Sequence, residues 1–294
     1  MARIVCLGDV MLDVLAQLPG PLAIGSDTPA PVEFAPGGSA ANTAAWLAWL
    51  GAPVSFSGRI GDDAFGAEAV AALRRLGVLT RVAIDFERPT GVCLVLVGPD
   101  GERTMVPSAG ANAAMSVADA VAGLEPGDHL HLSGYTLLNP GSRPAARAAL
   151  AAAGSVSVDA ASAAPLRAAG PVEFLSWLPA GAVLLANSDE LAALGGDPEA
   201  LVRRDLTVVV KRGPGGAEVF DRTGRLPVAT DPAPVRDSTG AGDAFAAGFL
   251  HARWQGADLA AAATAGNRTA ARALTRLGGR PPLDQPPDGP AQPV

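Results

Sequence analysis

A nine-residue segment in the C-terminal part of the chain carries the clearest chemical signal in the sequence. It reads Asp-Ser-Thr-Gly-Ala-Gly-Asp-Ala-Phe over residues 237–245 and leads into an apolar run typical of a helix. Glycines at a helix start let backbone N–H groups approach an anion closely, and the helix dipole adds to the attraction. Asp243 falls in the first helical turn, where the dipole favours the charged form, so we expect it to be ionised at neutral pH. A cradle for an anion beside a carboxylate that takes a proton from an attacking hydroxyl suits phosphoryl transfer.

Three other structures fit parts of this segment. A tight turn that enters a helix is common and needs no ligand. A dinucleotide-binding fingerprint requires a third glycine where Phe245 stands, and it usually opens the first βαβ unit of a chain. A Walker A loop requires Gly-Lys-Ser/Thr, which this segment lacks. The tight turn therefore stays as the plain alternative to an anion-binding helix start.

The whole segment resembles the C-terminal signature of the ribokinase-like (PfkB) carbohydrate kinases. Residues 37–44 are similar to the N-terminal signature of that family, and residues 58–66 continue the likeness. Gly8, Asp13 and the Gly-Ala-Asn of residues 110–112 match further family positions. The order and spacing of these motifs extend the resemblance over most of the chain. It implies an ATP-dependent kinase that phosphorylates an alcohol group of a small sugar or sugar-like molecule.

The resemblance also implies a catalytic group and an acceptor site. Asp243 would be the base, and the anion hole would consist of the amides of Gly240, Ala241 and Gly242. Four residues are implied to bind the sugar substrate: Asp13, Gly38, Ser39 and Asn42. A carboxylate and an amide can bind several hydroxyls, and glycine lets the ring lie close to the backbone. The alternatives are a solvent-exposed Asp13 and an Asn42 that satisfies a helix N-terminus.

Seven positions match residues that bind ATP and Mg²⁺ in the family: Asn187, Glu190, Lys211, Gly213, Gly216, Gly242 and Asn267. Several of them also have a plainer interpretation. Asn187 and Glu190 have the spacing of a helix capping box, and residues 211–216 have the composition of a tight hairpin turn. Asn267 lies on an alanine-rich run, where it can simply be exposed. Capping and Mg²⁺ binding can hold together, because acidic residues near Mg²⁺ commonly act through water.

The resemblance further implies a potassium (K⁺) site made mostly of backbone carbonyl oxygens. Its members would be Asp237, Thr239, Ala273, Arg276 and Gly278. The last position of the set is Pro282, where ribokinases tend to carry serine. Because Pro282 differs from the family residue, the predicted site consists of the other five positions.

Two departures from ribokinases bear on the identity of the acceptor. Ser39 stands where those enzymes usually carry lysine, and Ser133 lies near the position of a glutamate. Both family side chains would touch the sugar, so their replacement argues against ribose. A nucleoside is an alternative acceptor, although the chain has few aromatic residues to stack a base. A non-catalytic sugar-binding sensor is a second alternative, and the intact Asp243 argues against it.

The elements that must position these residues alternate along the chain. Strands are expected at Ile4–Leu7, Val54–Ser57, His129–Ser133, Ser155–Asp159, Val183–Ala186, Thr207–Lys211 and Ala217–Phe220. Helices are expected at Ser39–Leu50, Ala64–Leu76, Arg143–Ala153, Ser188–Leu194, Ala241–Trp254 and Leu259–Leu274. This alternation predicts a mostly parallel sheet with helices on both faces, in a single three-layer α/β/α domain over residues 1–280.

The segment from residue 82 to residue 106 has a different pattern. Val82–Phe86, Gly91–Val97 and Arg103–Val106 are strand-like and are joined by short turns, which predicts antiparallel hairpins. With the broken stretch over residues 14–35, they are expected to form a small β-sheet lid that covers a ligand. Exposed lid edges would support a homodimer. The Pro-rich residues 281–294 are expected to be a loose tail.

The composition argues against several other classes of protein. The net charge is −7 and no basic stripe is present, so a nucleic-acid partner is not expected. The alanine-rich runs contain Arg, Asp or Gly, and none has the length and apolarity of a membrane span. The N-terminus leads directly into a strand without a signal-peptide pattern, which predicts a cytoplasmic protein. Cys6 and Cys93 lie in apolar runs and are expected to be buried free thiols.

Overall fold

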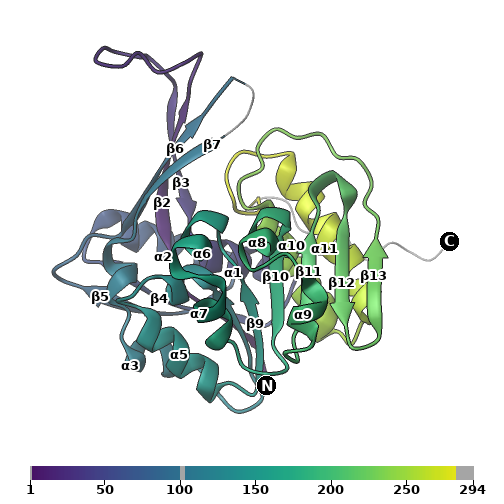
Figure 1. Cartoon of the computed structure of the whole chain (residues 1–294). Helices are drawn as coiled ribbons and strands as arrows, with labels where there is room; N and C mark the ends of the chain where they lie inside the picture. The colour runs from purple at the N-terminus through teal and green to yellow at the C-terminus, as the bar shows by residue number, and fades with distance from the viewer. Residues whose placement is uncertain (1, 100–102, 283–294) are drawn as a thin grey trace.

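Two β-sheets of unequal size organise the chain (Figure 1). The computed structural model describes residues 2–99 and 103–282, so the predicted loose tail lies outside the described residues from position 283 onward. The larger sheet has nine strands in the order β13-β12-β11-β10-β9-β8-β1-β4-β5, and the smaller has four in the order β3-β2-β6-β7. The predicted α/β fold class, with a separate small sheet, is confirmed.

The larger sheet is mostly parallel, as the alternation of elements predicts. Its strands are β1 (Ile4–Leu7), β4 (Val54–Gly61), β5 (Leu79–Asp85), β8 (His129–Ser133), β9 (Ser155–Asp159), β10 (Val183–Asn187), β11 (Thr207–Lys211), β12 (Ala217–Asp221) and β13 (Gly224–Val228). Only the two pairs that involve β12 are antiparallel. The central strand β1 lies between β8 and β4, with Cys6 opposite both His131 and Phe56. All four side chains of β1 are buried, because neighbours cover both edges and helices cover both faces.

Helices cover both faces of this sheet and complete the three layers. One face carries α1 (Ser39–Trp49), α2 (Ala64–Arg75), α10 (Ala241–Trp254) and α11 (Leu259–Leu274). The other carries α3 (Val117–Val121), α4 (Gly134–Leu138), α5 (Arg143–Ala152), α6 (Ala163–Ala169), α7 (Pro171–Ser176), α8 (Ser188–Ala193) and α9 (Pro198–Val202). Successive strand residues serve opposite faces, since Leu185 joins the first core and Leu184 the second.

The ways in which the long helices begin bear on the site. Asp63 accepts a hydrogen bond from the Gly66 amide at the start of α2, and Asp258 plays the same role for α11. These side chains satisfy amides that have no intrahelical partner. In contrast, α1 and α10 begin at Gly38 and Gly240, whose φ angles are 94° and 72°, without a side-chain cap. At α1 the Ser39 amide donates to Asp9 instead, and at α10 the Ala241 amide donates to the Ser238 carbonyl, so the amides of Gly242 and Asp243 are the ones without an acceptor within the helix.

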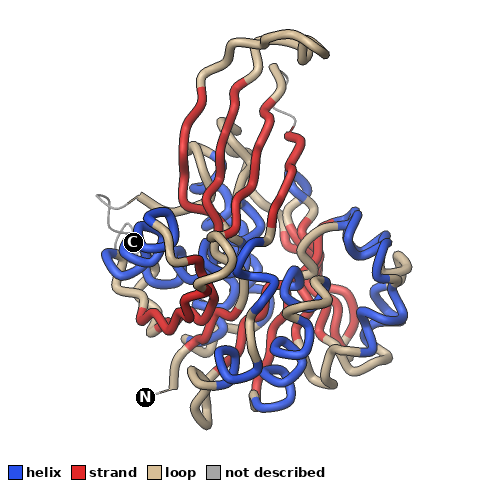
Figure 2. The backbone as a smooth tube through the Cα atoms, turned by 90° about the vertical axis from the view of Figure 1, so that its left-hand side faces the viewer, coloured by secondary structure: helices blue, strands red, loops and turns tan. Residues whose placement is uncertain are grey.

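The smaller sheet projects from the body as a lid (Figure 2). Its strands are β2 (Met11–Gln17), β3 (Val32–Gly37), β6 (Gly91–Val97) and β7 (Arg103–Ser108). The outer pairs β3–β2 and β6–β7 are antiparallel, while the central pair β2–β6 is parallel. The inner face carries a small apolar cluster of its own: Met11, Leu15, Cys93 and Val95.

One strand that was predicted for the lid lies in the larger sheet instead. The prediction placed residues 82–86 in an antiparallel hairpin, but β5 pairs in parallel with β4. Helix α2 supplies the crossover that parallel neighbours need. The short connection from Asp85 to Gly91 therefore passes from one sheet to the other, and the lid begins at Met11 rather than at residue 14.

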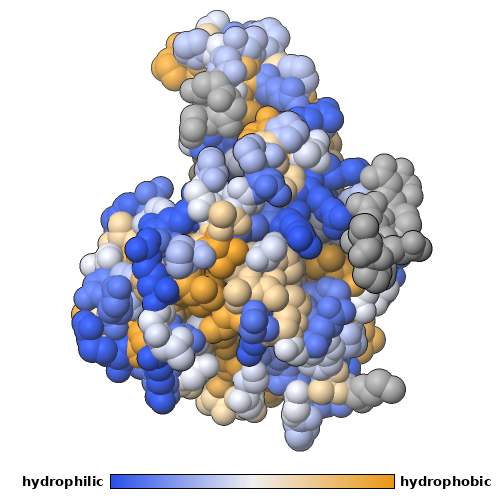
Figure 3. Space-filling view, turned by 90° about the vertical axis from the view of Figure 1, so that its right-hand side faces the viewer, coloured by the Kyte–Doolittle hydropathy of each residue, from blue (hydrophilic) through white to orange (hydrophobic). Residues whose placement is uncertain are grey.

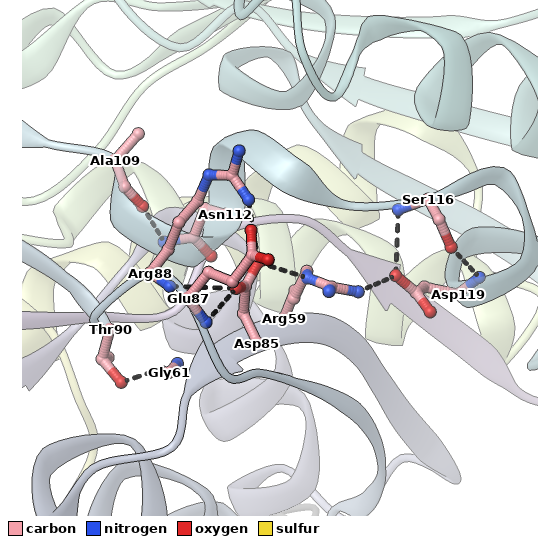
Figure 4. A network of polar contacts seen from close by, with 10 residues as sticks. All are labelled: Arg59, Gly61, Asp85, Glu87, Arg88, Thr90, Ala109, Asn112, Ser116 and Asp119. Carbon is pink, nitrogen blue, oxygen red and sulfur yellow. Dashed lines mark hydrogen bonds and ion pairs between the residues drawn. The ribbon is translucent and has the colours of Figure 1, made fainter.

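Charged side chains brace one side of the lid root (Figure 4). Arg59 on β4 donates to Asp85 at 3.0 Å and to Asp119 at 2.9 Å. Asp85 also accepts hydrogen bonds from the amides of Glu87 and Arg88, both at 2.9 Å. These bonds fix the turn that leads from β5 into β6.

Asn112, the last residue of the Gly-Ala-Asn motif, closes the other side of the lid root. Its Nδ2 donates to the carbonyls of Val10 at 2.9 Å and Ala109 at 3.0 Å. Its Oδ1 accepts the amide of Val10 at 3.1 Å. One buried side chain thus ties the start of β2 to the end of β7.

Two sequence expectations concern the chain as a whole. None of the helices in the described part of the chain combines the length and apolarity that a membrane crossing requires. The cytoplasmic setting stays a prediction. Cys6 and Cys93 are buried and unpaired, as expected.

Candidate functional site

A cleft of about 910 Å³ lies between the lid and the carboxyl ends of the parallel strands. Figure 3 shows the lid as a lobe that stands above the body. Ligands of open α/β sheets bind at the carboxyl edge, and the volume falls within the range of about 300–1,000 Å³ typical of ligand pockets. All of the predicted catalytic, sugar-binding and nucleotide-binding residues line this cleft, as does Thr239 of the predicted potassium set. The other four members of that set are not in its lining: Asp237, Ala273, Arg276 and Gly278.

Asp243 lies in the first turn of α10 and is held by two residues of α1. The Ser39 hydroxyl donates to its Oδ1 at 2.8 Å, and the Asn42 amide group donates to its Oδ2 at 2.9 Å. Ser39 and Asn42 are three residues apart on a helix and therefore share a face. Two segments about 200 residues apart in the sequence thus converge on one carboxyl group.

The protonation of Asp243 differs from the sequence-based expectation. Burial raises the pKa of Asp243 to about 8, although the hydrogen bonds from Asn42 and Ser39 lower it. The neighbouring carboxylates of Asp159 and Asp9 add to the rise. The expectation that Asp243 is ionised at neutral pH is therefore wrong, because loss of solvation outweighs the helix dipole. A carboxyl pKa near the working pH suits a group that must accept a proton and later release it.

The start of α10 accepts only glycine at position 240. Gly240 has a φ of 72°, and a Cβ there would lie 2.4 Å from the Cα of Gly279. The amide of Ala241 donates to the Ser238 carbonyl at 3.3 Å, which tightens the turn. The next amides belong to the first helical turn, where the helix itself supplies no acceptor. The loop therefore presents main-chain donors beside Asp243, as an anion-binding helix start requires.

The end of the cleft near the predicted sugar-binding residues holds two more carboxyl groups, Asp9 and Asp13. Asp9 Oδ2 accepts the amide of Ser39 at 2.8 Å, while its buried Oδ1 has no hydrogen-bond partner among the described residues. Buried polar atoms are rarely left unpaired, so Asp9 Oδ1 is an acceptor available to a hydroxyl of a ligand. Asp13 is buried on β2, and burial raises its pKa to about 6, with Asp9 adding to the rise. The solvent-exposed alternative for Asp13 is therefore wrong.

Arg280 is the cation that faces this group of carboxylates. Its Nε lies 3.4 Å from Asn42 Oδ1, and its Nη2 donates to the Gly37 carbonyl at 3.2 Å. Burial lowers the pKa of Arg280 to about 10, while Asp13 opposes that shift. Asn42 thus connects Arg280 on one side to Asp243 on the other.

The end of the cleft near the predicted nucleotide-binding residues contains a buried ion pair. Lys211 Nζ lies 2.7 Å from Asp159 Oδ2. Burial alone would lower the pKa of Lys211, but the charges of Asp159 and Glu190 raise it. Burial raises the pKa of Glu190 to about 7, against the influence of Lys211. Lys211 therefore stays charged next to Gly242, where an added Cβ would lie 3.1 Å from its Nζ.

The predicted nucleotide residues also had structural interpretations that need no ligand. The structure confirms the capping box and the hairpin turn but not an exposed Asn267. Asn187 and Glu190 do form a capping box, with the Glu190 amide 2.9 Å from Asn187 Oδ1 and the Asn187 amide 2.7 Å from Glu190 Oε2. Gly213 and Gly216 lie in the hairpin between β11 and β12, as the turn interpretation predicts. Asn267 is not exposed, because its Nδ2 donates to the carbonyls of residues 228 and 229 at 3.3 and 3.2 Å.

Hydrogen bonds join three of the five predicted potassium-site residues. Asp237 Oδ1 accepts from the Thr239 amide at 2.8 Å and from the Thr239 hydroxyl at 2.7 Å. Asp237 Oδ2 accepts the Gly278 amide at 2.9 Å. Ala273 lies at the end of α11 and Arg276 in the turn that follows, where the Arg276 amide donates to the Ala273 carbonyl at 3.2 Å. No group of three or more His, Cys, Asp or Glu side chains arranged to hold a metal occurs within residues 2–99 and 103–282.

Sequence reasoning missed four charged residues near the cleft: Asp9, Arg103, Asp159 and Arg280. Asp9 and Asp159 stand at or just after the carboxyl ends of β1 and β9. That position in a parallel sheet was a usable signal, since ligands gather at this edge. The two arginines follow no motif and reach the site only through the fold.

The chain is similar in sequence to known kinases over most of its length. The sequence model of the pfkB family carbohydrate kinases matches residues 1–286. The ATP-dependent ribose-1-phosphate kinase of Halopiger xanaduensis is 35% identical over 260 residues, which cover 86% of this chain and 85% of that protein. These matches extend across the lid and the larger sheet alike.

Solved structures show the same arrangement. A probable sugar kinase from Rhizobium etli CFN 42 superposes with a TM-score of 0.84 at 25% identity, covering 96% of both chains. Adenosine kinase from Sinorhizobium meliloti superposes with a TM-score of 0.81 at 26% identity, covering 95% of this chain and 96% of that one. By sequence and by fold, the chain belongs to the pfkB family of ATP-dependent carbohydrate kinases.

Proposed function

We propose that the protein transfers the terminal phosphoryl group of ATP to a hydroxyl of a sugar or sugar-like acceptor, with Asp243 as the base. The observation that carries this proposal is the place of Asp243, at an open helix start beside the Gly240–Gly242 turn and facing a large cleft. The acceptor oxygen forms a bond to the terminal phosphorus as the bond to the β-phosphate oxygen breaks. Asp243 takes the hydroxyl proton, and ADP leaves.

The charge that develops on the transferring group needs fixed donors. We propose that the amides of Gly240, Ala241 and Gly242 supply them, with Lys211 as a neighbouring cation. Support comes from the open turn at Gly240 and from the short distance between Lys211 Nζ and the Gly242 position. Donors that are fixed before the reaction stabilise developing charge at no cost of reorganisation.

The acceptor is proposed to bind with Asp13, Gly38, Ser39 and Asn42, joined by the unpaired Asp9 Oδ1. Carboxylates accept hydrogen bonds from hydroxyls but repel phosphate, so the acceptor turns hydroxyls toward this wall. If the acceptor is already phosphorylated, as in the similar ribose-1-phosphate kinase, its phosphate points away from Asp9 and Asp13. A neutral pentose or hexose is the first candidate.

A nucleoside is the second candidate, and an apolar part of the cleft favours it. Met11, Met105, Pro107, Tyr135 and Leu138 line the same cleft as Asp13. Such a surface suits a flat base attached to the sugar. The fold similarity to an adenosine kinase supports the same candidate.

ATP is proposed to lie along the hairpin of Gly213 and Gly216, near Asn267. Mg²⁺ is proposed to be held near Asn187 and Glu190, where it neutralises phosphate charge. Both oxygens of Glu190 already accept hydrogen bonds from Asn187, so contact through water fits this side chain better than direct ligation.

Potassium activation is proposed for the turn that contains Asp237 and Gly278. The oxygens of Asp237 already accept three hydrogen bonds, so backbone carbonyls of Thr239, Ala273, Arg276 and Gly278 would supply most ligands. Turnover in potassium chloride compared with choline chloride at equal ionic strength tests the site. Equal turnover in the two salts would contradict the proposed potassium site.

A homodimer through the lid is proposed from one apolar row. The strand register places Phe34, Val14, Leu94 and Val106 side by side on the outer face. Phe34 is 67% exposed and Val106 is 56% exposed. A second copy would cover this row, because exposed apolar patches on soluble proteins commonly mark interfaces. Light scattering of the wild type and of Val106→Lys measures whether the chain forms this dimer.

An acceptor screen tests the central proposal. ADP release is measured with pentoses, hexoses, ribose 1-phosphate, sugar acids and nucleosides, each with and without Mg²⁺. We expect at least one acceptor to give Mg²⁺-dependent ADP release together with a phosphorylated product. Acceptor binding without any turnover would instead support the sugar sensor.

A further inference from the structure

Arg103, at one end of lid strand β7, contacts the loop that leads into the anion-binding turn. Its Nη1 donates to the Thr239 hydroxyl at 2.5 Å, and its Nη2 donates to the Ser238 hydroxyl at 2.6 Å. Nη1 also lies 3.7 Å from Asp237 Oδ1, and 19% of the Arg103 side chain is exposed. One guanidinium thus binds three consecutive residues of the loop.

The position of Arg103 within the lid makes this contact distinctive. The strand β7 enters the body at Ser108, five residues away, where Asn112 fixes the lid root. Five strand residues span about 16 Å, so Arg103 lies well away from the root. The lid is therefore joined to the body by the chain at its root, and by the contacts of Arg103 with the Ser238–Thr239 loop away from the root.

The residues that Arg103 contacts connect in two ways to Gly240, at the start of the helix that carries Asp243. Thr239 precedes Gly240, the residue that opens the anion-binding turn. Asp237 binds the amide of Gly278, and the next residue, Gly279, packs on Gly240.

The same segment reaches the helix that holds the acceptor. The Gly279 carbonyl accepts a hydrogen bond from Trp46 Nε1 at 2.9 Å. Trp46 lies on α1, the helix whose Ser39 and Asn42 hold Asp243. A continuous set of contacts therefore runs from the lid to both helices of the site.

We infer that Arg103 is a positioning residue that holds the lid over the acceptor and fixes the Ser238–Thr239 loop for phosphoryl transfer. The planar guanidinium can reach two hydroxyls at once, whereas a lysine ammonium would act as a point charge. When the lid opens for exchange of ligands, these bonds break. The anion-binding turn is then braced only from the body. This inference rests on the proposed kinase activity and adds a coupling between closure and catalysis.

Kinetics of Arg103→Gln and Arg103→Lys test the coupling. A small misplacement of reacting groups can cost about 10²-fold in rate, so we expect kcat of Arg103→Gln to fall about 10- to 100-fold. The acceptor KM should rise several-fold while the ATP KM stays within about twofold. Arg103→Lys should recover only part of kcat, because one ammonium cannot span both hydroxyls. The matched control is Thr104→Ala, the next residue of β7, which faces away from the loop and should behave like wild type.

A partner substitution and a measurement without turnover complete the test. If Arg103 acts through Ser238, then Ser238→Ala should lower kcat less than Arg103→Gln, and the double variant should be no worse than Arg103→Gln alone. Hydrogen exchange of residues 91–97 and 103–108 should be faster in Arg103→Gln than in Thr104→Ala, whether or not an acceptor is known. Wild-type exchange and wild-type kcat in Arg103→Gln would overturn the inference. Absence of acceptor-dependent turnover in the wild type, with faster exchange in the variant, would reject the kinase proposal alone.

Discussion

The two sides of the cleft are built in different ways. The side formed by the larger sheet belongs to a three-layer body, and its polar groups are largely paired with one another, as in Lys211–Asp159 and Asn187–Glu190. The lid side is a four-stranded sheet with a small apolar cluster, and it brings Asp13 and Arg103 to the ligand space or its border. The proposed base and the proposed nucleotide residues therefore lie on the body, whereas the proposed acceptor site combines Asp13 of the lid with Ser39 and Asn42 of the body. Substitutions of Asp243 and Lys211 on the body should affect turnover, nucleotide binding or stability, and substitution of Asp13 on the lid should affect acceptor binding.

The strongest test of the body side is Asp243→Asn. General base catalysis commonly contributes about 10²- to 10⁴-fold, so we expect kcat to fall by at least that range. The isosteric amide should leave ATP binding unchanged, which fluorescence titration with a nucleotide analogue measures. Because the raised pKa makes ionisation of Asp243 costly in the folded state, the variant should lose less stability than wild type as pH rises through about 8. Turnover near that of wild type would show that another group is the base.

The buried ion pair of the body provides the next largest effect. Lys211→Met leaves Asp159 buried and uncompensated, which should destabilise the protein by about 3–5 kcal/mol in urea unfolding. The matched control is the double variant with Asp159→Asn, which should recover most of the stability but not the ATP KM. If the double variant binds ATP like wild type, Lys211 has no role in the nucleotide site.

Asp13→Asn addresses the lid side. Loss of a hydrogen bond to a charged group costs about 1.5–3 kcal/mol, so we expect the acceptor KM to rise roughly 10- to 100-fold. The ATP KM should stay unchanged in the same assay. Val14→Ala is the control, since the next residue of β2 points to the outer face. An equal rise in both KM values would mean that Asp13 acts through the fold rather than on the acceptor.

The pH dependence of kcat/KM tests both sides in a single profile. A base must be deprotonated, so kcat/KM should fall about tenfold per pH unit below the Asp243 pKa of about 8. Below pH 6 the fall should steepen, because Asp13, with a pKa of about 6, also becomes protonated. The variant Asp13→Asn should lose that steeper part alone. A profile that is flat from pH 5 to pH 9 would contradict both assignments.

The sequence predicted the parts of the site that local patterns mark. The segment at residues 237–245 and the signature at residues 37–44 are local patterns, and the structure brings both to one cleft. The wrong prediction for β5 has the same local origin, because a short turn after Asp85 resembles a hairpin whichever sheet the chain enters next. The ionisation of Asp243 was misjudged because its burial depends on α1, about 200 residues away.

Other features had no local signal at all. Arg103 and Arg280 act through partners more than 100 residues distant, so no spacing rule marks them. Strand β13 and the short helices such as α3 and α9 were also missed, since five residues are too few for a clear period. Burial and distant pairing, rather than composition, decide these features.

The contact between Gly240 and Gly279 bears on the folding of the nascent chain during translation. A nascent chain that has emerged only as far as residue 270 already contains the proposed acceptor residues, the β11–β12 hairpin and Asp243. It still lacks the segment around Gly279 that packs against the turn at Gly240 and accepts the Trp46 hydrogen bond. The turn at Gly240 can therefore take its described packing only after the chain has been synthesised through Gly279.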